Sequence, residues 1–387
     1  MRLHYYYRYF LMTGAVLLMM NLTFGQVHIE LESVPESTPK DATIFISGNL
    51  NHWNPANNSY ALNKSLDGKY RVTLDSAPEN LEFKFTRGSW DAVEGDVMGR
   101  NIPNRIFYVT QPDTLLLDVH SWEDLDGGGE IKSTANSQVI TWDSAMWIPQ
   151  LKRSRLIRVY LPKDYYTSSR RYQVIYMLDG QNVFDMTTSY AGEWQVDETL
   201  SKLEQQGKRS AIVVAIDNGG PLRISEYSPY PNEKFGVDEG HEFVRFLVET
   251  LKPKVDQSFR TKKDAENTAI VGSSLGALIA HYAYFKYPNV FSKVGIFSPS
   301  YWYLPEFFDL TKHPKTKENP RIYMLAGEHE EGMIDRTKEM YQRLMDGGFS
   351  NNEVHLDIDP DGTHSEAFWA RKFEEAYLWL FEETEKP

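Results

Sequence analysis

The sequence predicts an α/β protein in two parts, a small all-β domain at residues 26–122 and a larger, mostly parallel sheet covered by helices at residues 137–387. Two patterns of apolar residues support this division. Short alternating runs separated by turn residues, with no helical segments between them, fill the first part. Apolar strands that alternate with helical segments fill the second. A chain of 387 residues with 41% hydrophobic residues is long enough for two ordinary globular domains.

The first 25 residues have the pattern of a secretory signal peptide. Two arginines precede an apolar run at residues 10–20, and this run is too short to cross a bilayer comfortably. The small residues Thr23 and Gly25 occupy the minus-three and minus-one positions for cleavage before Gln26. We therefore expect a secreted or periplasmic protein with no stable membrane span after cleavage. An uncleaved N-terminal anchor is the alternative.

Composition excludes several classes of site and partner. The chain contains no cysteine, so it has no disulfide framework, no thiolate nucleophile, no zinc-thiolate site and no lipid-modified cysteine. Its formal charge is −13, and loss of the two arginines in residues 1–25 changes this charge to −15. Such acidity argues against nucleic acid or an anionic membrane as the main partner.

In residues 26–122, four runs have the alternation typical of strands, at 42–46, 70–74, 81–85 and 105–109. Turn clusters separate them, and this spacing predicts a small immunoglobulin-like antiparallel sandwich. The acidic, glycine-rich segment at 123–136 is the expected linker.

In residues 137–387, two antiparallel strands are expected first, at 139–142 and 155–160. Six further strands are predicted at 172–178, 211–216, 268–271, 294–297, 321–325 and 354–358. The predicted helices are 196–206, 239–255, 275–287, 335–345 and 366–382. This alternation favours a mostly parallel sheet with helices on both faces. The sequence shows no internal repeat.

The segment TAIVGSSLGA at residues 268–277 carries the strongest functional pattern in the chain. An apolar run breaks into a turn of small residues and then into a helix-forming segment, as in the nucleophile elbow GxSxG. Ser274 has Gly272 and Gly276 at the required offsets, whereas the preceding serine lacks a glycine two positions earlier. The pattern predicts Ser274 as a nucleophile. A glycine-serine turn without chemistry is the alternative.

A serine hydroxyl needs a base to take its proton, and His364 is the best placed of the ten histidines. It lies in a loop between the last predicted strand and the last predicted helix. In open α/β sheets, loops beyond the carboxyl ends of strands converge on the active site. His313 and His329 are alternatives, and so is an exposed loop histidine without a function.

The acid that orients this base should follow a strand between the serine and the histidine. The predicted strand at 321–325 leads into the acidic loop GEHEEG. Glu330 is the preferred acid. The alternatives are Glu328, Glu331 and Asp335, because a loop of acids is often only solvated. No second ligand cluster with metal spacing accompanies this loop, so neither a metal nor a cofactor is expected.

The chain order serine, acid, histidine is that of α/β-hydrolases. A developing oxyanion needs two preorganised N–H donors. One should be the backbone N–H of Leu275, the residue after the nucleophile, and the other should come from the turn at 179–182, where Gln181 is the preferred donor. A plain turn built on Gly180 is the alternative.

Seven segments together are specific to one family: YMLDGQNVFD, GEWQVDETL, AIDNGGPLRISEYSPY, VGSSLGA, FSPSYWY, YMLAGEHEEG and DGTHSEAFW. Through them, residues 137–385 resemble the esterase family of α/β-hydrolases that includes esterase D, feruloyl esterases and ferric-enterobactin esterase. The resemblance implies an α/β-hydrolase fold and ester hydrolysis through an acyl-enzyme. It also implies a triad of Ser274, Glu330 and His364, with Gln181 and Leu275 around the oxyanion. The several carboxylates in GEHEEG depart from the family pattern.

Four aromatic residues match positions expected near the pocket of this family, where they would stack on a sugar or phenolic ring: Trp194, Tyr227, Tyr301 and Trp302. Packing in the core is the alternative for each, because large aromatic side chains dominate cores. Arg223 and Glu226 are expected to form a structural ion pair.

The first part resembles starch- and glycogen-binding modules through ISGNLNHWNP, LEFKFTRGSWDAVEGD and the Asn104-Arg105 pair. Such modules hold glucan by stacking sugar rings on exposed tryptophans. Trp90 and Trp53 are the candidates, and Trp90 is the better one because it follows the FKF strand. A sandwich that only supports or shields the active site is the alternative.

Together these patterns predict a secreted serine esterase that acts on an acylated carbohydrate or a related ester without a cofactor. Two alternatives belong to other classes. One is a carbohydrate-binding protein with an inactive hydrolase scaffold, and the other is an acyltransferase or peptidase that uses the same triad.

Overall fold

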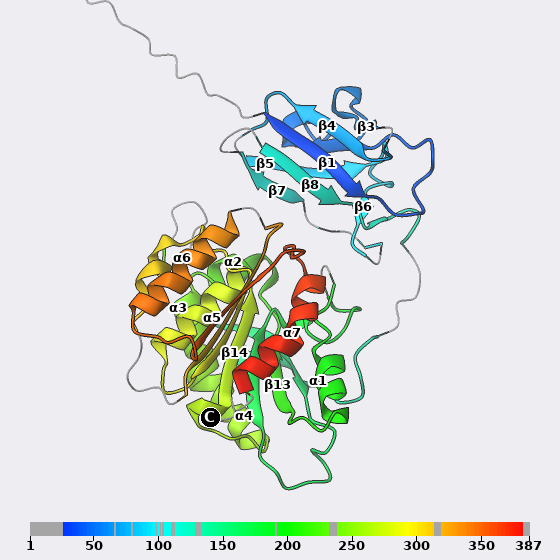
Figure 1. Cartoon of the computed structure of the whole chain (residues 1–387). Helices are drawn as coiled ribbons and strands as arrows, with labels where there is room; N and C mark the ends of the chain where they lie inside the picture. The colour runs from blue at the N-terminus through cyan, green and yellow to red at the C-terminus, as the bar shows by residue number, and fades with distance from the viewer. Residues whose placement is uncertain are drawn as a thin grey trace, which may run out of the picture. The chain divides into compact units, whose positions relative to one another are not determined.

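The computed structural model describes residues 26–65, 67–78, 80–97, 99–100, 102, 104–109, 113–127, 133–189, 192–231, 238–312, 319–330 and 332–381. The predicted signal peptide at residues 1–25 and the alternative base His313 lie outside the described residues. The chain divides into two compact units, Met1–Gly129 and Glu130–Pro387. Figure 1 draws the first unit in blue to cyan and the second in green to red.

The described part of the first unit consists of strands and two short 3-10 helices. One sheet has the order β3-β4-β1-β8, with β1 (Val27–Ser33), β3 (Asn63–Lys64), β4 (Tyr70–Leu74) and β8 (Asp113–Asp118). A second sheet contains β2 (Phe45–Gly48), β5 (Asn80–Thr86) and β7 (Arg105–Tyr108), and a two-stranded ribbon pairs β6 (Glu94–Gly95) with β9 (Ser121–Trp122). The helices are η1 (Asn49–Asn51) and η2 (Asn58–Tyr60). Side chains from both sheets and from the ribbon, among them Ile29, Phe83 and Trp122, form one apolar core.

Two strands of this unit, β1 and β8, were not among the four predicted runs, and they pair with each other in parallel. The other neighbour of β1 is the antiparallel strand β4. The expectation of purely antiparallel pairing is therefore wrong for this sheet. The β1–β8 ladder joins segments more than 80 residues apart, so the alternation of residues within either strand does not predict this pairing.

The segment predicted as a linker, 123–136, is anchored at both of its described ends. In the first unit, Trp122 N donates to Asp126 Oδ2 at 2.8 Å, and Glu123 N donates to Val93 O at 3.0 Å. In the second unit, Asn136 N donates to Asp197 Oδ2 at 2.8 Å. The division between the units falls between Gly129 and Glu130, inside the predicted segment.

The second unit is built on one sheet of eight strands with the order β10-β11-β13-β12-β14-β15-β16-β17. Its strands are β10 (Val139–Ile148), β11 (Arg153–Tyr160), β12 (Gln173–Leu178), β13 (Ala211–Ile216), β14 (Thr268–Ser273), β15 (Lys293–Phe297), β16 (Arg321–Gly327) and β17 (Val354–Asp359). The pairs from β13 to β17 are parallel, whereas β10 and β11 pair antiparallel at one edge. All eight predicted strands of this part are present, which confirms the mostly parallel sheet.

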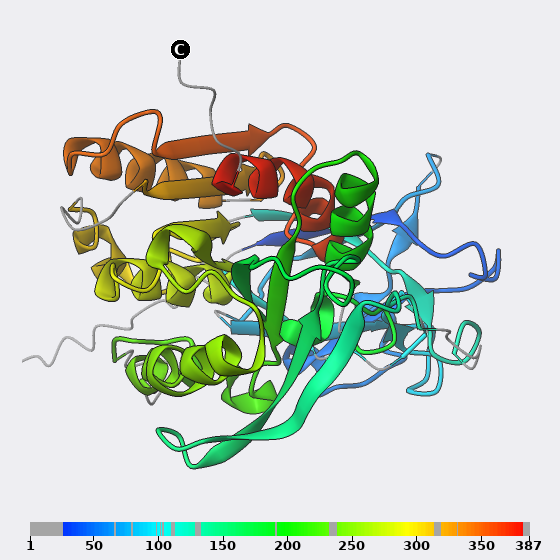
Figure 2. The same cartoon turned by 90° about the horizontal axis from the view of Figure 1, so that it is seen from below.

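Helices cover both faces of this sheet (Figures 1 and 2). One face carries α1 (Val196–Gln205) and α7 (Glu366–Phe381), whose apolar side chains pack with Ile175 and Met177 of β12. The other face carries α3 (Gly240–Arg245), α5 (Leu275–Lys286) and α6 (Met333–Asp346), which pack with Val174 and Tyr176. Because neighbouring residues of a strand point to opposite faces, an uninterrupted apolar strand such as β12 supplies both cores.

The remaining helices are short: α2 (Arg223–Glu226), η3 (Gly180–Asn182), η4 (Gly220–Leu222), η6 (Ala265–Asn267) and η7 (Pro305–Asp309). The helix predicted at 239–255 is divided into α3, a π-helical segment (Phe246–Leu251) and α4 (Lys252–Ser258). Pro253 lacks the N–H that regular α-helical bonding would need at this point. In the described part of the chain, none of the helices has the length and apolar character required to span a membrane.

Candidate active site

Ser274 stands at the turn between β14 and α5, at the carboxyl end of a central parallel strand. Its backbone has φ 58° and ψ −122°, a left-handed conformation that costs free energy for a residue with a side chain. The surrounding structure holds this conformation, since Ser274 N donates to Phe297 O at 2.9 Å. This is the sharp strand-to-helix turn that the sequence pattern predicts.

The two glycines of the motif allow the chain to cross itself closely at this turn. A Cβ atom on Gly272 would lie 2.4 Å from the carbonyl oxygen of Gly276, well inside contact distance. A side chain at Gly272 would therefore displace the turn, whereas one at Gly276 would press on the carboxylate of Asp179, 3.0 Å from its Cβ atom.

Glu330 and His364 meet at the carboxyl ends of β16 and β17. Glu330 Oε1 lies 2.7 Å from His364 Nδ1, and Glu330 Oε2 accepts a hydrogen bond from Gly327 N at 2.6 Å. The Glu330 side chain is 0% exposed, and the imidazole is 38% exposed. A carboxylate on Nδ1 favours the tautomer with its proton there, which leaves the Nε2 lone pair available as a base.

The structure separates Glu330 from the other acids that the sequence left open. Glu328 and Asp335 are exposed, and Glu331 lies outside the described residues. Of the alternative histidines, His329 is exposed and donates its backbone N–H to Gly362 O. Among the described residues, no group of three or more acidic or histidine side chains is arranged to hold a metal ion.

Two neighbours of these residues, Ser300 and Trp369, were not predicted from the sequence. Within the described residues, the hydroxyl of Ser274 hydrogen-bonds only Ser300 Oγ, at 3.1 Å, and no hydrogen bond joins it to His364. Such contacts are often long in unliganded enzymes and shorten when substrate binds. The ring of Trp369 packs edge-on against His364 with centroids 5.2 Å apart, and its Nε1 donates to Ser298 Oγ at 2.8 Å. Trp369 therefore limits how far the imidazole turns.

The turn after β12 forms the 3-10 helix η3, with Gln181 at its second position. The first N–H groups of a helix have no partner within it, and this applies to Gln181 and to Leu275, the first residue of α5. Gly180 is required here because a Cβ atom on it would lie 2.6 Å from the backbone carbon of Ile216. The turn and the elbow thus place two amides that hydrogen-bond no described residue at the same edge of the sheet.

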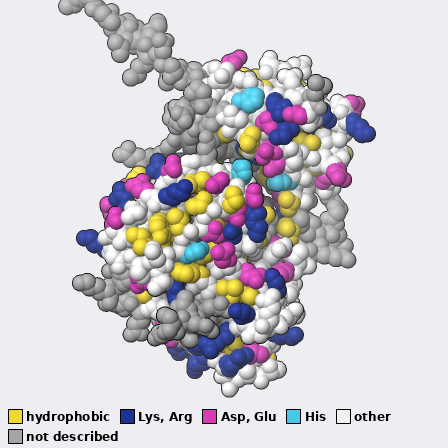
Figure 3. All heavy atoms as spheres, viewed as in Figure 1, with side chains coloured by type: hydrophobic (Ala, Val, Ile, Leu, Met, Phe, Trp, Pro, Cys, Tyr) yellow, Lys and Arg dark blue, Asp and Glu magenta, His cyan; other side chains and the backbone are white. Residues whose placement is uncertain are grey.

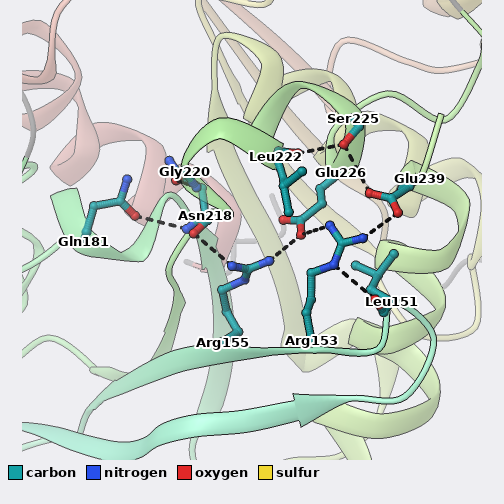
Figure 4. A network of polar contacts seen from close by, with 10 residues as sticks. All are labelled: Leu151, Arg153, Arg155, Gln181, Asn218, Gly220, Leu222, Ser225, Glu226 and Glu239. Carbon is teal, nitrogen blue, oxygen red and sulfur yellow. Dashed lines mark hydrogen bonds and ion pairs between the residues drawn. The ribbon is translucent and has the colours of Figure 1, made fainter. Parts of the chain in front are cut away.

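The side chain of Gln181 joins a polar network behind this turn (Figure 4). Gln181 Oε1 accepts from Asn218 N at 3.1 Å, and Asn218 O accepts from Arg155 Nη1 at 3.2 Å. Arg155 and Arg153 both form ion pairs with the buried carboxylate of Glu226. Burial raises the pKa of Glu226, although both arginines favour its charged form.

The ion pair expected between Arg223 and Glu226 is absent, because Glu226 is held by this network and Arg223 faces elsewhere. Arg223 instead forms two hydrogen bonds with Asp179, from Nε to Oδ1 at 2.6 Å and from Nη2 to Oδ2 at 2.9 Å. Arg223 and Glu226 are close in sequence on α2, but the short helix turns them to different partners.

Three of the four aromatic residues expected to contact substrate are packing residues in this structure. Trp194 is 3% exposed and lies between Phe297 and Trp369. Tyr227 is fully buried, and so is Tyr301, whose hydroxyl lies 2.9 Å from His281 Nδ1. A buried ring has no face left for a ligand, so the packing alternative holds for these three.

The fourth aromatic residue and the two first-unit tryptophans are placed differently. Trp302 is 44% exposed, in the loop that follows β15. Trp90 is 43% exposed, and its ring lies 6.2 Å from that of the partly exposed Trp53, with an angle of 38° between the planes. All three rings therefore keep a surface that a ligand can reach.

Comparison with known proteins gives matches of two kinds. Two of the curated esterases that match are the ferri-bacillibactin esterase BesA of Bacillus subtilis (strain 168), 29% identical over 199 residues, and an endo-1,4-beta-xylanase/feruloyl esterase of Xylanibacter ruminicola, 23% identical over 250 residues. The matches cover 45% and 64% of this chain, and 66% and 31% of those proteins. An alpha-amylase of Niallia circulans matches over 94 residues at 39% identity, which covers 24% of this chain and 7% of that protein.

A solved structure, the enterobactin esterase FES from Shigella flexneri, has a similar fold, with a TM-score of 0.53 at 17% identity and coverage of 87% of each chain. The model of the family described as "Putative esterase" matches residues 148–380, which include every candidate residue of the second unit. Because this match spans more than half of the chain, we conclude that the chain belongs to this esterase family and is a carboxylic ester hydrolase.

Proposed function

We propose that the second unit is a serine esterase in which Ser274 is the nucleophile, His364 the general base and Glu330 the acid that orients it. One observation carries this proposal: the 2.7 Å contact between Glu330 and His364 lies at the same edge of the sheet as the strained turn of Ser274. In an open sheet of parallel strands, this edge is where catalytic groups gather.

The chemistry follows from these positions. His364 Nε2 takes the proton of Ser274 Oγ as the oxygen forms a bond to the ester carbonyl carbon. The protonated imidazole, stabilised by Glu330, then gives that proton to the departing alcohol, and the acyl group remains on Ser274. A water molecule, deprotonated by the same imidazole, releases the acid and restores the serine.

The amides of Leu275 and Gln181 form the oxyanion site in this proposal. Both belong to helix N-termini, where N–H groups lack internal partners. At Leu275 the dipole of α5, a helix of 12 residues, also favours negative charge. Donors fixed before the reaction stabilise the charge that develops on the carbonyl oxygen without rearranging.

The proposed substrate is an acylated carbohydrate or a related ester. Two observations support this class, the relative named as a feruloyl esterase joined to a xylanase and the exposed ring of Trp302. The pattern of residues 1–25 supports a secreted or periplasmic location for the reaction.

A second function, glucan binding, is proposed for the first unit. The exposed pair of Trp90 and Trp53 supports it, as does the match to an alpha-amylase. In this proposal the unit is an immunoglobulin-like carbohydrate-binding sandwich that keeps the esterase near polymeric substrate.

The central test is hydrolysis of a short aryl ester by Ser274→Ala. We expect at least a roughly thousand-fold loss of kcat, because no other group replaces the acyl-enzyme. Ser273→Ala, which removes the neighbouring hydroxyl, is the matched control and should retain most activity. Turnover by Ser274→Ala at the wild-type rate would remove the proposal.

A further inference from the structure

Asp179 places a carboxylate beside both segments that carry the proposed oxyanion donors. It precedes the turn of Gly180 and Gln181, and its backbone carbonyl accepts a hydrogen bond from Asn182 N at 2.9 Å. On the other side, a Cβ atom on Gly276 would lie only 3.0 Å from Asp179 Oδ2. Gly276 follows Leu275, so this one carboxylate adjoins both segments that carry the proposed oxyanion donors, the turn of η3 and the start of α5.

A negative charge in this place opposes catalysis unless it is cancelled. The transition state of ester hydrolysis carries negative charge on the carbonyl oxygen, and like charges repel strongly at short range in a site shielded from water. Arg223 meets this carboxylate with the two parallel hydrogen bonds described above. Asn218 Nδ2 adds a third, to Asp179 Oδ1 at 2.7 Å.

The position of Arg223 is itself held from a second side. Its guanidinium lies over the ring of Tyr227, 5.0 Å from the centroid, and the Tyr227 hydroxyl accepts a hydrogen bond from Asp179 N at 3.2 Å. The buried tyrosine therefore supports both members of the pair. This contact explains why Tyr227 is close to the site and yet has no surface for substrate.

Asp179 has a left-handed backbone, with φ 54° and ψ 49°, which is uncommon for a residue other than glycine. Its side chain is fixed by Arg223 and Asn218, and this anchoring maintains the backbone conformation of the turn that leads into Gln181. Loss of Arg223 would thus remove a charge and loosen a turn.

We propose that Arg223 is a positioning residue that neutralises Asp179 behind the oxyanion site, so that the amides of Gln181 and Leu275 face a nearly neutral surface. The proposal rests on the proposed function, because it concerns the same two donors. Arg223 touches Asp179, and it acts on the reaction only through that carboxylate.

The test is a set of charge variants, Arg223→Gln, Asp179→Asn and the double variant, assayed for kcat and KM with a short aryl ester. Arg223→Gln should lower kcat by about 10- to 100-fold, with a smaller change in KM, because an uncancelled charge acts on the transition state. The double variant should recover at least half of that loss on a logarithmic scale. Arg223→Lys should fall between Arg223→Gln and wild type.

The matched control is the exposed pair of Arg245 and Glu249, one turn apart on their helical segment and far along the chain from the elbow. Its neutralisation should leave kcat unchanged. If Asp179→Asn/Arg223→Gln is as slow as Arg223→Gln, the proposal is overturned. In a pair with only a structural role, removal of Asp179 after Arg223 would not restore kcat. If Arg223→Gln does not fold, Asp179→Asn/Arg223→Gln and Arg223→Lys still decide the question. Wild-type activity of Ser274→Ala would instead overturn the proposed function.

A separate observation points to a second binding site at the opposite end of the sheet. A cavity of about 890 Å³ lies where β12 and β13 begin, whereas the elbow lies where β14 ends. Its lining contains six basic residues, Lys163, Arg170, Arg171, Lys208, Arg209 and Lys262, and two acidic ones, Asp164 and Glu204. Figure 3 shows Lys and Arg side chains gathered at the lower end of the second unit. This clustering contrasts with the net charge of −13 of the chain.

The charges in this cavity do not balance. Asp164 pairs with Arg170 and accepts from the Tyr172 hydroxyl at 3.0 Å, and Glu204 accepts from Lys163 N at 3.2 Å. Four of the basic side chains form no ion pair with any described residue: Lys163, Arg171, Arg209 and Lys262. We infer that this cavity binds a compact anion with several phosphate or carboxylate groups. A hollow of this size fits such an anion better than a flat lipid surface.

Calorimetric titration of the full chain with inorganic tripolyphosphate at low salt tests this inference. Wild type should bind it, and Arg171→Gln/Lys262→Gln should bind at least about tenfold more weakly, because two of its charges are gone. Lys254→Gln/Lys286→Gln removes two exposed lysines outside the cavity and should bind as wild type does. Citrate as a second titrant separates carboxylates from phosphates as the source of the charges. Equal binding by both double variants, or binding only to vesicles of anionic lipid, would overturn the inference.

Discussion

The two units differ in how they place the aromatic residues that were predicted to contact a ligand, although Trp302 of the second unit is exposed. In the second unit, Trp194, Tyr227 and Tyr301 surround the site but are buried, so they stabilise the elements that carry it. In the first unit, Trp90 is exposed and lies beside Trp53 on the surface. The comparison teaches that an aromatic residue near a predicted site is a ligand contact only where the fold leaves one of its faces open. Four predictions test this comparison, beginning with the largest expected effect.

The largest effect should come from the acid of the second unit. Glu330→Gln should lower kcat by about 10²- to 10⁴-fold, because the amide no longer holds the imidazole as the correct tautomer or stabilises its cation. Steady-state hydrolysis of an aryl ester measures this loss. Glu328→Gln changes an exposed acid two residues away and is the control. Equal activity of the two variants would show that Glu330 has no such role.

The next largest effect concerns stability. Trp194→Ala should lower the free energy of unfolding of the second unit by about 3 to 5 kcal/mol, because it opens a cavity beside Phe297 and Trp369. Trp302→Ala, at an exposed position, should cost less than about 1 kcal/mol. Urea unfolding followed by circular dichroism compares the variants. Similar losses of unfolding free energy in Trp194→Ala and Trp302→Ala would show that burial does not distinguish the two rings.

A buried carboxyl of the second unit should make its stability depend on pH. Burial raises the pKa of Glu366 to about 7, with the neighbouring Asp179 adding to the effect, and Asn182 Nδ2 donates to its Oε1 at 3.0 Å. Between pH 4.5 and 7 the folded chain keeps this proton, whereas the unfolded chain releases it. The free energy of unfolding should therefore fall as the pH rises through this window, by about 2 to 3 kcal/mol.

Glu366→Gln should reduce this slope, since the amide does not titrate and still accepts a hydrogen bond from Asn182; the raised pKa values of Glu198 and Asp217 maintain the rest. Glu339→Gln, at an exposed position on α6, should keep it. Unfolding in urea at several pH values gives the slopes. An unchanged slope in Glu366→Gln would assign the pH dependence to another group.

The smallest effect should appear in glucan binding. Trp90→Ala should weaken binding of the full chain to soluble starch by about tenfold, because one stacking face is lost. Trp147→Ala removes a similarly exposed tryptophan from β10 and should bind as wild type does. Affinity electrophoresis in starch gels compares the two. If both variants migrate as wild type does, the first unit binds no glucan through Trp90.

Much of the second unit was predictable from its sequence. Continuous apolar strands alternate there with amphipathic helices, and local residues set both patterns, so seven of the eight strands lie within a few residues of their predicted bounds. The strand predicted at 139–142 extends to Ile148, and the helix predicted at 239–255 is divided. The elbow was equally local, because two glycines and a serine within five residues determine its turn. In the first unit, β1 and β8 escaped prediction because their partner strands are distant in sequence.

Neighbours along the chain are sufficient to predict the fold of the second unit, the elbow at Ser274 and the candidate base His364. Which acid meets His364, which carboxylate meets Arg223 and which aromatic rings remain exposed depend instead on how distant segments pack together. The pairs Glu330–His364 and Asp179–Arg223 span 34 and 44 residues, and each joins loops from different strands. The physical reason is that the order of strands in the sheet, rather than distance along the chain, sets which loops meet and which side chains are buried between them.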